Sequence, residues 1–249
     1  MAVALGAVLG AILGSFLNVV GHRLPRGESI VHPGSKCPGC GTPVKPYDNV
    51  PVLSWLLLRG RCRACRAPIS IRYPLVEAAT AVLCAAVVLD RHGQPDALVG
   101  LALVLLLVPV TLIDLDVRRI PNVLTATGAL VAVGLVGLTD PGGLPEHLIA
   151  GAAAGAFLLV AAIVRPGGMG MGDVKLAGVL GLFLGRDVGA ALLVALLAGT
   201  AVGAVLMARK GAEAGRKTAV PFGPFLALGG VAALFAGDPL IAWYLERFA

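Results

Sequence analysis

Charged side chains are scarce in this sequence of 249 residues. Aspartate, glutamate, lysine and arginine together make up 14% of it, aromatic residues make up 5%, and hydrophobic residues make up 57%. A soluble domain contains about 25% charged residues and needs them to cover its surface. The shortage of charge, with a mean hydropathy of +0.90, excludes an ordinary soluble domain and predicts a protein embedded among membrane lipids.

A single basic patch is lacking as well. The formal net charge is +6, but the lysine and arginine residues recur between apolar stretches along the chain. Nucleic-acid binding needs such residues gathered on one face. We therefore predict no nucleic-acid partner and interpret the basic residues as markers of membrane topology.

Long apolar stretches are abundant, and a membrane-spanning helix needs about 20 apolar residues. Residues 174–208 are too long for one span and contain Gly185-Arg186-Asp187, so we expect two helices with a tight turn there. The first stretch lacks the basic start and the cleavage site of a removed signal peptide, so it is predicted to remain as an anchor. The sequence thus predicts an all-α polytopic membrane protein with about eight spans, at residues 2–21, 74–90, 97–113, 122–138, 147–164, 174–185, 188–208 and 219–237.

The distribution of basic residues predicts the orientation. Eight alternating spans leave four segments on the side where the first span ends, and these segments hold 17 of the 20 lysine and arginine residues. Basic residues favour the cytoplasmic side of a membrane. We therefore expect a multi-pass protein of the inner (cytoplasmic) membrane with its N-terminus outside. Its cytoplasmic segments are predicted to be 22–73, 114–121, 165–175 and 209–218.

The five cysteines do not form the pattern of a secreted disulfide framework. Four of them form two Cys-x-x-Cys pairs separated by 21 residues, and the fifth, Cys84, lies inside an apolar run where we expect inert packing. Two such pairs can close a tetrahedral zinc site that leaves no open position for catalysis. A pair of redox motifs is the alternative, but such motifs need a βαβ context. We predict a structural zinc site formed by Cys37, Cys40, Cys62 and Cys65.

Only one segment has the composition of a small polar domain. Residues 22–73 carry prolines, glycines, basic residues and all four paired cysteines. The chain is therefore predicted to contain a first transmembrane helix (1–21), a cytoplasmic zinc domain (22–73) and a larger transmembrane domain (74–249). No repeat of 20–50 residues is evident.

Three aspartates stand out, because an ionisable side chain at the edge of a membrane span is costly and is by default a functional candidate. Asp114 and Asp116 lie where the third span emerges, and Asp173 begins the sixth. The predicted orientation places all three on the cytoplasmic side. Two carboxylates at one site suit aspartyl proteolysis, because one activates water while its protonated partner polarises the scissile carbonyl. The structural alternatives are that Asp173 caps its helix and that Asp116 pairs with Arg118 or Arg119.

The residues around these aspartates resemble those of the bacterial prepilin peptidases, also called type IV leader peptidases, which are membrane aspartyl proteases with a Gly-x-Gly-Asp motif. Here the motif is Gly170-Met171-Gly172-Asp173, followed by Val174-Lys175. The first catalytic aspartate of the family stands seven residues before a proline that is followed by Asn or Asp. Counting back from Pro121-Asn122 gives Asp114. Further segments resemble the family in the same order, namely Gly14–Val20, Tyr47–Trp55, Arg59–Cys62 and Arg72–Glu77.

The resemblance implies that Asp114 and Asp173 are catalytic, and that Gly170, Gly172 and Lys175 belong to the substrate-binding or active-site loop. The two glycines suit this role because they allow close approach of a substrate or a turn with positive φ. The implied activity is that of a membrane aspartyl endopeptidase, with 74–249 as its protease domain. It would remove the leader of type IV prepilins or pseudopilins at the cytoplasmic membrane surface, in type IV pilus assembly or secretion.

A methyltransferase activity rests on the resemblance alone. Many relatives with this cysteine domain also methylate the new N-terminus with S-adenosylmethionine. The sequence has no G-x-G-x-x-G turn after a strand that would bind such a cofactor.

Two other functions remain open at this point. A small transporter would use Asp114 and Asp173 as proton carriers, although transporter sites tend to lie near the midplane within inverted repeats. An intramembrane protease of the presenilin kind shares the Gly-x-Gly-Asp motif, but its other aspartate follows a tyrosine, whereas Ile113 precedes Asp114 here. Asn18 and Glu77, within the first two spans, either line the active cavity or form interhelical hydrogen bonds.

Overall fold

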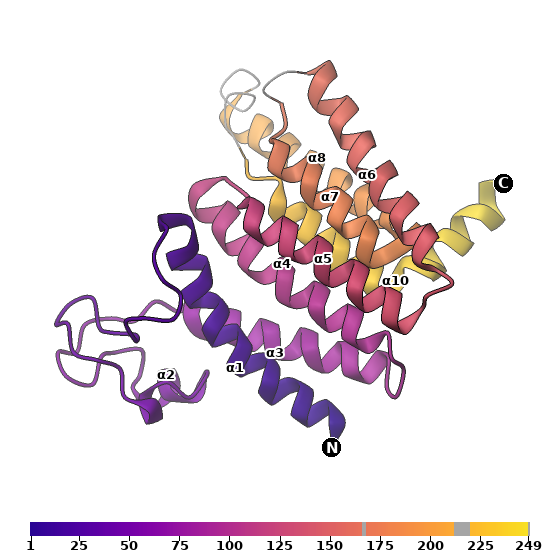
Figure 1. Cartoon of the computed structure of the whole chain (residues 1–249). Coiled ribbons are helices and arrows are strands. Elements are labelled where there is room, and N and C mark those ends of the chain that lie inside the picture. Colours follow the sequence, from indigo (N-terminus) through magenta and orange to yellow (C-terminus); the bar gives the residue numbers. More distant parts are fainter. Residues whose placement is uncertain (166–167, 212–219, 249) are drawn as a thin grey trace. The chain divides into compact units, whose positions relative to one another are not determined.

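The computed structural model describes residues 1–165, 168–211 and 220–248. Within these ranges the chain is helical, and extended segments pair only in two isolated β-bridges. The predicted all-α class is therefore confirmed for the part of the chain that is described. The helices form two compact units, Met1–His92 and Gly93–Ala249, which are shown with their labels in Figure 1.

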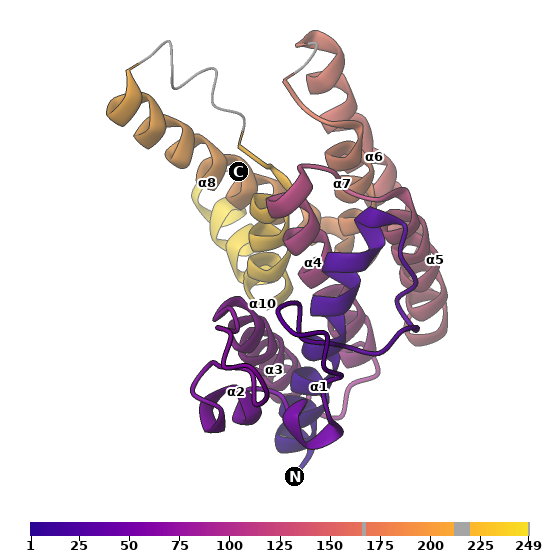
Figure 2. The same ribbon diagram turned by 90° about the vertical axis from the view of Figure 1, so that its left-hand side faces the viewer.

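Two long helices and the segment between them form the first unit. Helices α1 (Ala2–Arg23) and α3 (Arg72–Asp90) pack against each other. The connecting segment contains only short helices, which are η1 (Leu24–Arg26), η2 (Pro46–Asp48) and α2 (Leu53–Leu57). Figure 2 shows the loops of this segment together with α2 and α3.

Helices α4 and α7 form the centre of the second unit. Four of their side chains, Leu103, Ile113, Leu176 and Leu180, have no exposed surface. Helix α6 packs on α7, α8 packs on α10, and α5 contacts both α4 and α7. The elements of this unit are α4 (Ala97–Val117), α5 (Asn122–Thr139), α6 (Leu144–Val164), α7 (Met171–Leu184), η3 (Gly185–Asp187), α8 (Val188–Lys210) and α10 (Gly223–Phe248).

Each of the eight predicted spans corresponds to one of the long helices among the described residues. By length and composition, six helical segments can cross a membrane, with α7 and α8 counted as one segment, Met171–Arg209, of 39 residues. The 3₁₀ turn η3 divides this segment, which confirms the expected break. Helix α10 contributes a shorter apolar stretch, Gly223–Gly237. In the predicted cytoplasmic loop 209–218, residues 212–218 lie outside the described residues.

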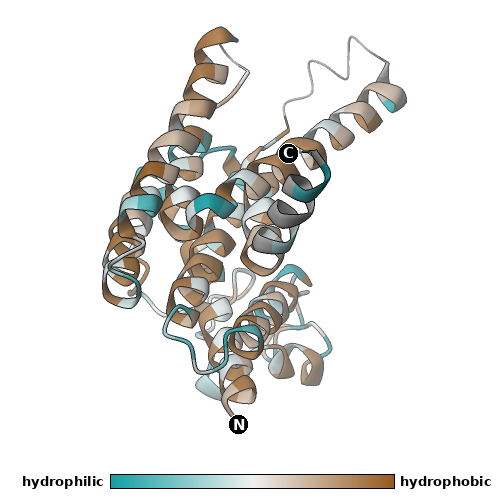
Figure 3. Ribbon diagram, turned by 90° about the vertical axis from the view of Figure 1, so that its right-hand side faces the viewer, coloured by the Kyte–Doolittle hydropathy of each residue, from teal (hydrophilic) through white to brown (hydrophobic). Residues whose placement is uncertain are grey.

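Apolar side chains also cover the outside of the helices. Leu130 and Leu138 of α5, and Ile149 and Ile163 of α6, are each more than two-thirds exposed. Hydrophobic residues dominate the helix ribbons in Figure 3. A water-soluble protein does not expose so much contiguous apolar surface, whereas lipid chains cover it at no cost. The chain is therefore a multi-pass membrane protein.

Glycines set the distance between α1 and α3. A Cβ atom on Gly10 would lie 2.8 Å from the Thr80 carbonyl oxygen and from Cys84 Cβ, and one on Gly14 would lie 3.0 Å from the Glu77 Cα atom. Small residues allow such close approach of helices in lipid, where packing rather than the hydrophobic effect drives association. Cys84 is buried in this contact, in agreement with the expected packing role.

Replacing Gly10 with valine is expected to destabilise the first unit by about 1–3 kcal/mol, the usual cost of overpacking. Valine at Gly134, on the exposed side of α5 with no neighbour within 4 Å of its Cβ position, is the matched control. Thermal unfolding of the detergent-solubilised protein measures both effects. Equal melting temperatures for the two variants would contradict the close packing of α1 and α3.

Candidate functional site

Asp114 lies near the C-terminal end of α4 and is buried, with 4% of its surface exposed. Asp116, two residues later, is exposed. Residues two apart on a helix point about 200° apart, so only one of this pair can face the helices that surround α4. Leu112 and Ile113 before Asp114 are buried as well, which brings the carboxyl group into the packed end of the second unit.

A backbone hydrogen bond holds the Asp114 carboxylate. The Gly223 N–H, at the first residue of α10, donates to Asp114 Oδ2 over 2.8 Å in a buried position. The first N–H groups of a helix have no partner within the helix, and the helix dipole favours negative charge there. A Cβ atom on Gly223 would lie 2.7 Å from the same oxygen, so this contact requires glycine.

Asp173 lies at the other kind of helix end, as the third residue of α7. Its Oδ2 accepts a hydrogen bond of 3.1 Å from the N–H of Gly170, the N-cap residue of α7. Asp173 is therefore not the N-cap residue of its helix, but its carboxylate does hold the N–H of the residue that is. The carboxylates of Asp114 and Asp173 are close enough to interact electrostatically. The fold therefore brings together two aspartates 59 positions apart in the chain.

The glycines of the Gly-x-Gly-Asp motif have an ordinary backbone conformation, and what matters is that they lack a side chain. Gly170 has an extended conformation with φ −80°, and neither Gly170 nor Gly172 is among the described glycines with positive φ. Of the two roles considered for these glycines, the positive-φ turn is absent, and close approach of a substrate remains a prediction. Gly172 instead permits close contact with the chain that follows α4, since a Cβ atom there would lie 3.0 Å from Ile120 Cβ.

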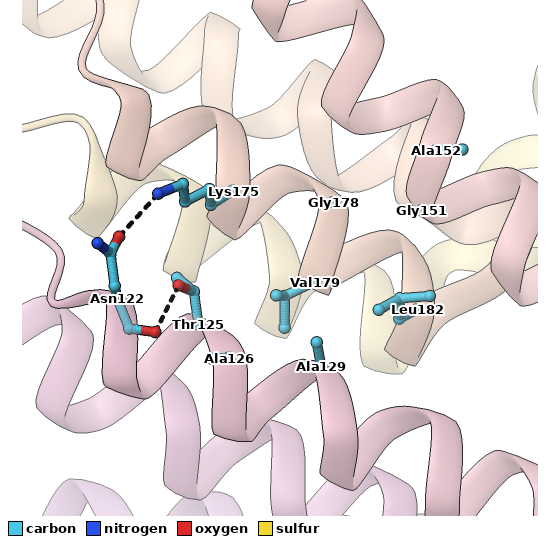
Figure 4. Close-up of a pocket in the computed structure, with 10 residues that line it drawn as sticks. All are labelled: Asn122, Thr125, Ala126, Ala129, Gly151, Ala152, Lys175, Gly178, Val179 and Leu182. Atoms are coloured by element: carbon cyan, nitrogen blue, oxygen red, sulfur yellow. Dashed lines mark hydrogen bonds between the residues drawn. The ribbon is translucent and has the colours of Figure 1, made fainter.

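Lys175 lies one helical turn into α7, outside the aspartate pair. Its Nζ donates a 2.9 Å hydrogen bond to Asn122 Oδ1 at the start of α5. The two residues stand at one end of an open groove of about 560 Å³ between α5, α6 and α7 (Figure 4). Apart from Thr125, the other residues that line the groove are apolar, with Ala126, Gly151 and Leu182 among them.

Asn18 and Glu77 form polar contacts inside the first unit. The Asn18 amide donates to the carbonyl oxygens of Gly14 and Tyr73, both over 3.3 Å, so it links α1 to α3. Glu77 Oε2 accepts a 2.7 Å hydrogen bond from the Val52 N–H. The Asn18 contact is the interhelical hydrogen bond that was one of its two predicted roles, whereas Glu77 bonds to the backbone of the segment before α2.

The four paired cysteines converge. The Sγ atoms of Cys37, Cys40, Cys62 and Cys65 all lie within 4.8 Å of one another, and those of Cys37 and Cys65 are 3.7 Å apart. A tetrahedral zinc ion with Zn–S bonds of about 2.3 Å requires sulfur atoms about 3.8 Å apart. The cluster can therefore hold a metal ion.

The two cysteine pairs lie in turns of the same construction. The Cys37 N–H bonds to Thr42 O and the Cys62 N–H to Ala67 O, and a β-bridge closes each turn. The residue after the second cysteine has positive φ in both turns, +71° at Gly41 and +62° at Arg66. This local repeat, with a period of 25 positions, was not evident from the sequence because the residues between the cysteines differ.

Hydrogen bonds lower the pKa of one thiol in each turn, Cys40 and Cys62, whereas contacts with the other cysteines raise the pKa of Cys65 to about 11. Contact with Thr42, whose hydroxyl lies 3.2 Å from Cys40 Sγ, lowers the pKa of the Cys40 thiol to about 6. The backbone N–H groups of Cys65 and Ala64 lower the pKa of Cys62 as well. Since the thiolate is the form that binds metal, both turns are suited to act as ligand pairs.

Sequence reasoning missed two residues of these sites. Gly223 lies in Pro221-Phe222-Gly223-Pro224, and the proline after it marks a helix start, but nothing in the sequence connects that start with Asp114. Val52 precedes α2 and bonds to Glu77, 25 positions later. Both contacts use a backbone N–H, which any residue except proline offers, so residue identity gives no signal.

Comparison with known proteins matches the two units separately. A family model described as the bacterial peptidase A24 N-terminal domain matches residues 8–91. A second, described as the type IV leader peptidase family, matches residues 101–208. No solved structure matches the chain.

Curated relatives match across both units. The following three are each named prepilin leader peptidase/N-methyltransferase. The Aeromonas hydrophila protein is 38% identical, over 95% of this chain and 91% of its own length. The Pseudomonas aeruginosa protein is 35% identical, over 96% and 92%. The Myxococcus xanthus protein is 43% identical, over 85% and 64%. The chain therefore belongs to the type IV leader peptidase family.

Proposed function

We propose that this chain is a membrane aspartyl endopeptidase that removes the leader of type IV prepilins or pseudopilins, with Asp114 and Asp173 as its catalytic residues. Membership of the leader peptidase family supports the activity and the substrate class. One structural observation supports the residues: α4 and α7 contact each other and carry two aspartates within electrostatic range, and a backbone N–H at the start of a helix holds each carboxylate.

The arrangement suits the chemistry of peptide hydrolysis. Two carboxylates that share one catalytic site do not readily ionise together, so such a pair retains one proton. The ionised member takes a proton from water as the water oxygen attacks the scissile carbonyl carbon, and the protonated member donates a hydrogen bond to the carbonyl oxygen. A proton then passes to the leaving amine as the C–N bond breaks. Gly223 and Gly170 each hold one carboxylate oxygen, which leaves the second oxygen to face the reacting groups.

Asparagine at Asp114 or at Asp173 keeps the size of the side chain but removes the base and the shared proton. We expect either change to lower cleavage by about 10³-fold or more. The double variant should be no worse than either single one, because the two acids act as a unit. The assay is co-expression with a leader-bearing prepilin, followed by the mass of its N-terminus.

Asp116→Asn is the matched control, since Asp116 lies on the exposed side of the same helix end. It should retain most of the activity, with unchanged expression and membrane insertion for all variants. If the Asp116→Asn variant is inactive and the Asp114→Asn variant is active, the first catalytic aspartate is Asp116 and not Asp114. Full activity of both the Asp114→Asn and the Asp173→Asn variant would refute the proposal that the chain is an aspartyl protease.

Alanine at Gly223 places a methyl group against Asp114 Oδ2 and should displace that carboxylate without unfolding the unit. A misplacement of about 1 Å at a catalytic group costs about 10²-fold in rate, so we expect kcat to fall by about 10- to 100-fold. Alanine at Gly189, an exposed position on α8 with no neighbour within 4 Å, should leave kcat unchanged. Equal rates for the two variants would show that the Gly223 contact does not position Asp114.

We further propose that the cysteine cluster binds one zinc ion per chain. The spacing of the sulfur atoms, the two matching turns and the low thiol pKa values of Cys40 and Cys62 support this choice. With four thiolate ligands such an ion has no open position, so it would stabilise the segment between α1 and α3 and take no part in the reaction.

Serine at Cys40 is expected to lower the zinc content, measured by elemental analysis of the purified protein, and to make residues 24–71 sensitive to protease, because metal binding is coupled to folding. Serine at Cys84 is the control, since this cysteine lies in the helix contact away from the cluster. A wild-type protein that contains no zinc and cleaves at the full rate would refute the metal site.

For the orientation we propose an N-terminus outside and a catalytic pair that faces the cytoplasm, in the inner membrane among its lipids. The excess of lysine and arginine in the four predicted cytoplasmic segments supports this arrangement. In functional terms we propose to divide the chain into the first span (1–21), the cysteine domain (22–73) and the protease domain (74–249).

N-methylation of the new N-terminus by S-adenosylmethionine is supported by the names of the relatives alone. The groove between α5 and α7 does not fit this cofactor. Among the described residues that line it, Lys175 is the only charged one and none offers a carboxylate for the ribose hydroxyls. We therefore assign no residue and no step to the methyl donor.

A further inference from the structure

The short helix α2 exposes three large apolar side chains to solvent. Leu53 and Leu56 are 58% and 57% exposed, and Leu57 is 82% exposed. Trp55 and Ser54 fix the opposite side of the helix: the Trp55 Nε1 donates to Ile69 O over 3.0 Å, and the buried Ser54 hydroxyl donates to Tyr47 O. The leucines are therefore held outward by a rigid attachment.

A hydrogen bond fixes where α2 stands along the membrane-spanning helix α3. The residue before α2, Val52, donates its N–H to the buried carboxylate of Glu77 over 2.7 Å. Glu77 is the sixth residue of α3, about 7.5 Å along its axis from Arg72 at a rise of about 1.5 Å per residue. The start of α2 is therefore held level with the first turns of a membrane-spanning helix.

The turn at Val52 shows that this placement is maintained against the local preference of the chain. Val52 has φ +61° and ψ −52°, and the Leu53 N–H bonds to Pro51 O within the turn. Such γ-turns are rare and strained, most of all at a β-branched residue. Surrounding structure has to impose this conformation, and the Glu77 carboxylate on the Val52 N–H does so.

The charge around α2 matches an anionic surface. Exposed Arg59 and Arg61 follow the helix directly, and residues 22–73 contain nine basic side chains against two acidic ones. Both ends of this segment continue into membrane spans, α1 and α3. Apolar side chains flanked by arginines suit the boundary between acyl chains and anionic headgroups.

We propose that α2 seats the cysteine-bearing segment on the membrane, with Leu53, Leu56 and Leu57 inserted into the anionic leaflet. The occupant of this apolar surface is thus lipid. The carboxylate of Glu77 is a positioning group that sets the depth of insertion. This inference depends on the membrane spans and does not require the proposed proteolysis.

Tryptophan at Leu57 reports the surroundings of this surface in the full-length protein, reconstituted into vesicles of equimolar phosphatidylcholine and phosphatidylglycerol. Leu57 is the most exposed of the three leucines, so the change should not disturb folding. Relative to the wild-type signal, the added emission should shift to the blue. Lipids brominated near the headgroup end of their acyl chains should quench most of it. The matched control is Val44→Trp, beside the first cysteine turn, which these lipids should not quench.

Three outcomes decide the proposal. Quenching of Leu57→Trp by brominated lipid, with Val44→Trp unaffected, supports it. Quenching by aqueous acrylamide instead would show that α2 stands in water, and overturns it. Blue-shifted emission that neither agent quenches would show that protein covers the leucines, either residues 93–249 or a second copy, and overturns it as well. A failed cleavage assay has no effect on any of these readings.

Discussion

The hydrogen bond from the Gly223 N–H to Asp114 is the interaction on which the candidate site depends. It joins the end of α4 to the start of α10, 109 positions later. Within a bilayer every backbone polar group needs an internal partner, and the first N–H groups of a helix are those left over. The protein satisfies this requirement with the aspartates themselves: α10 uses Asp114, and α7 uses Asp173 through Gly170. The same two hydrogen bonds therefore stabilise the fold and set the geometry of the site.

Close helix packing makes these bonds possible. Helix α7 can stand at the centre of its unit because Gly181 faces the backbone of Ala150 on α6 and Gly230 faces Leu180 from α10. Larger residues at either position would move a neighbouring helix outward. Since interiors deform little, such a shift would change the separation of the carboxylates. Glycine-rich composition, which is a general feature of membrane helices, here has a direct effect on the chemistry.

Sequence reasoning succeeded where the signal is local. Charge-poor stretches gave the long helices, and two Cys-x-x-Cys pairs gave the cluster. The choice of Asp114 over Asp116 came from the family spacing before Pro121-Asn122, and the structure buries Asp114 and exposes Asp116. It failed where the partner is a distant backbone atom, as at Gly223 and Val52, because an N–H group carries no residue identity. It left two roles open for Gly170 and Gly172, close approach or a positive-φ turn, because the sequence shows that side chains are missing but not whether the backbone turns. The same applies to the positive φ of Arg66, where a glycine would have been the visible sign.

The length of α7 matters because of where this helix stands. Its 14 residues rise about 21 Å, against a hydrocarbon core of about 30 Å. It cannot grow, because η3 begins with a positive φ at Gly185 and the chain before Met171 is extended. Helices α4, α5, α6 and α10 pack around α7, so protein and not lipid makes up most of its surroundings. An ionisable side chain can therefore stand in the first turn of a helix too short to span the core, where a lipid-facing helix of the same length would expose it to acyl chains.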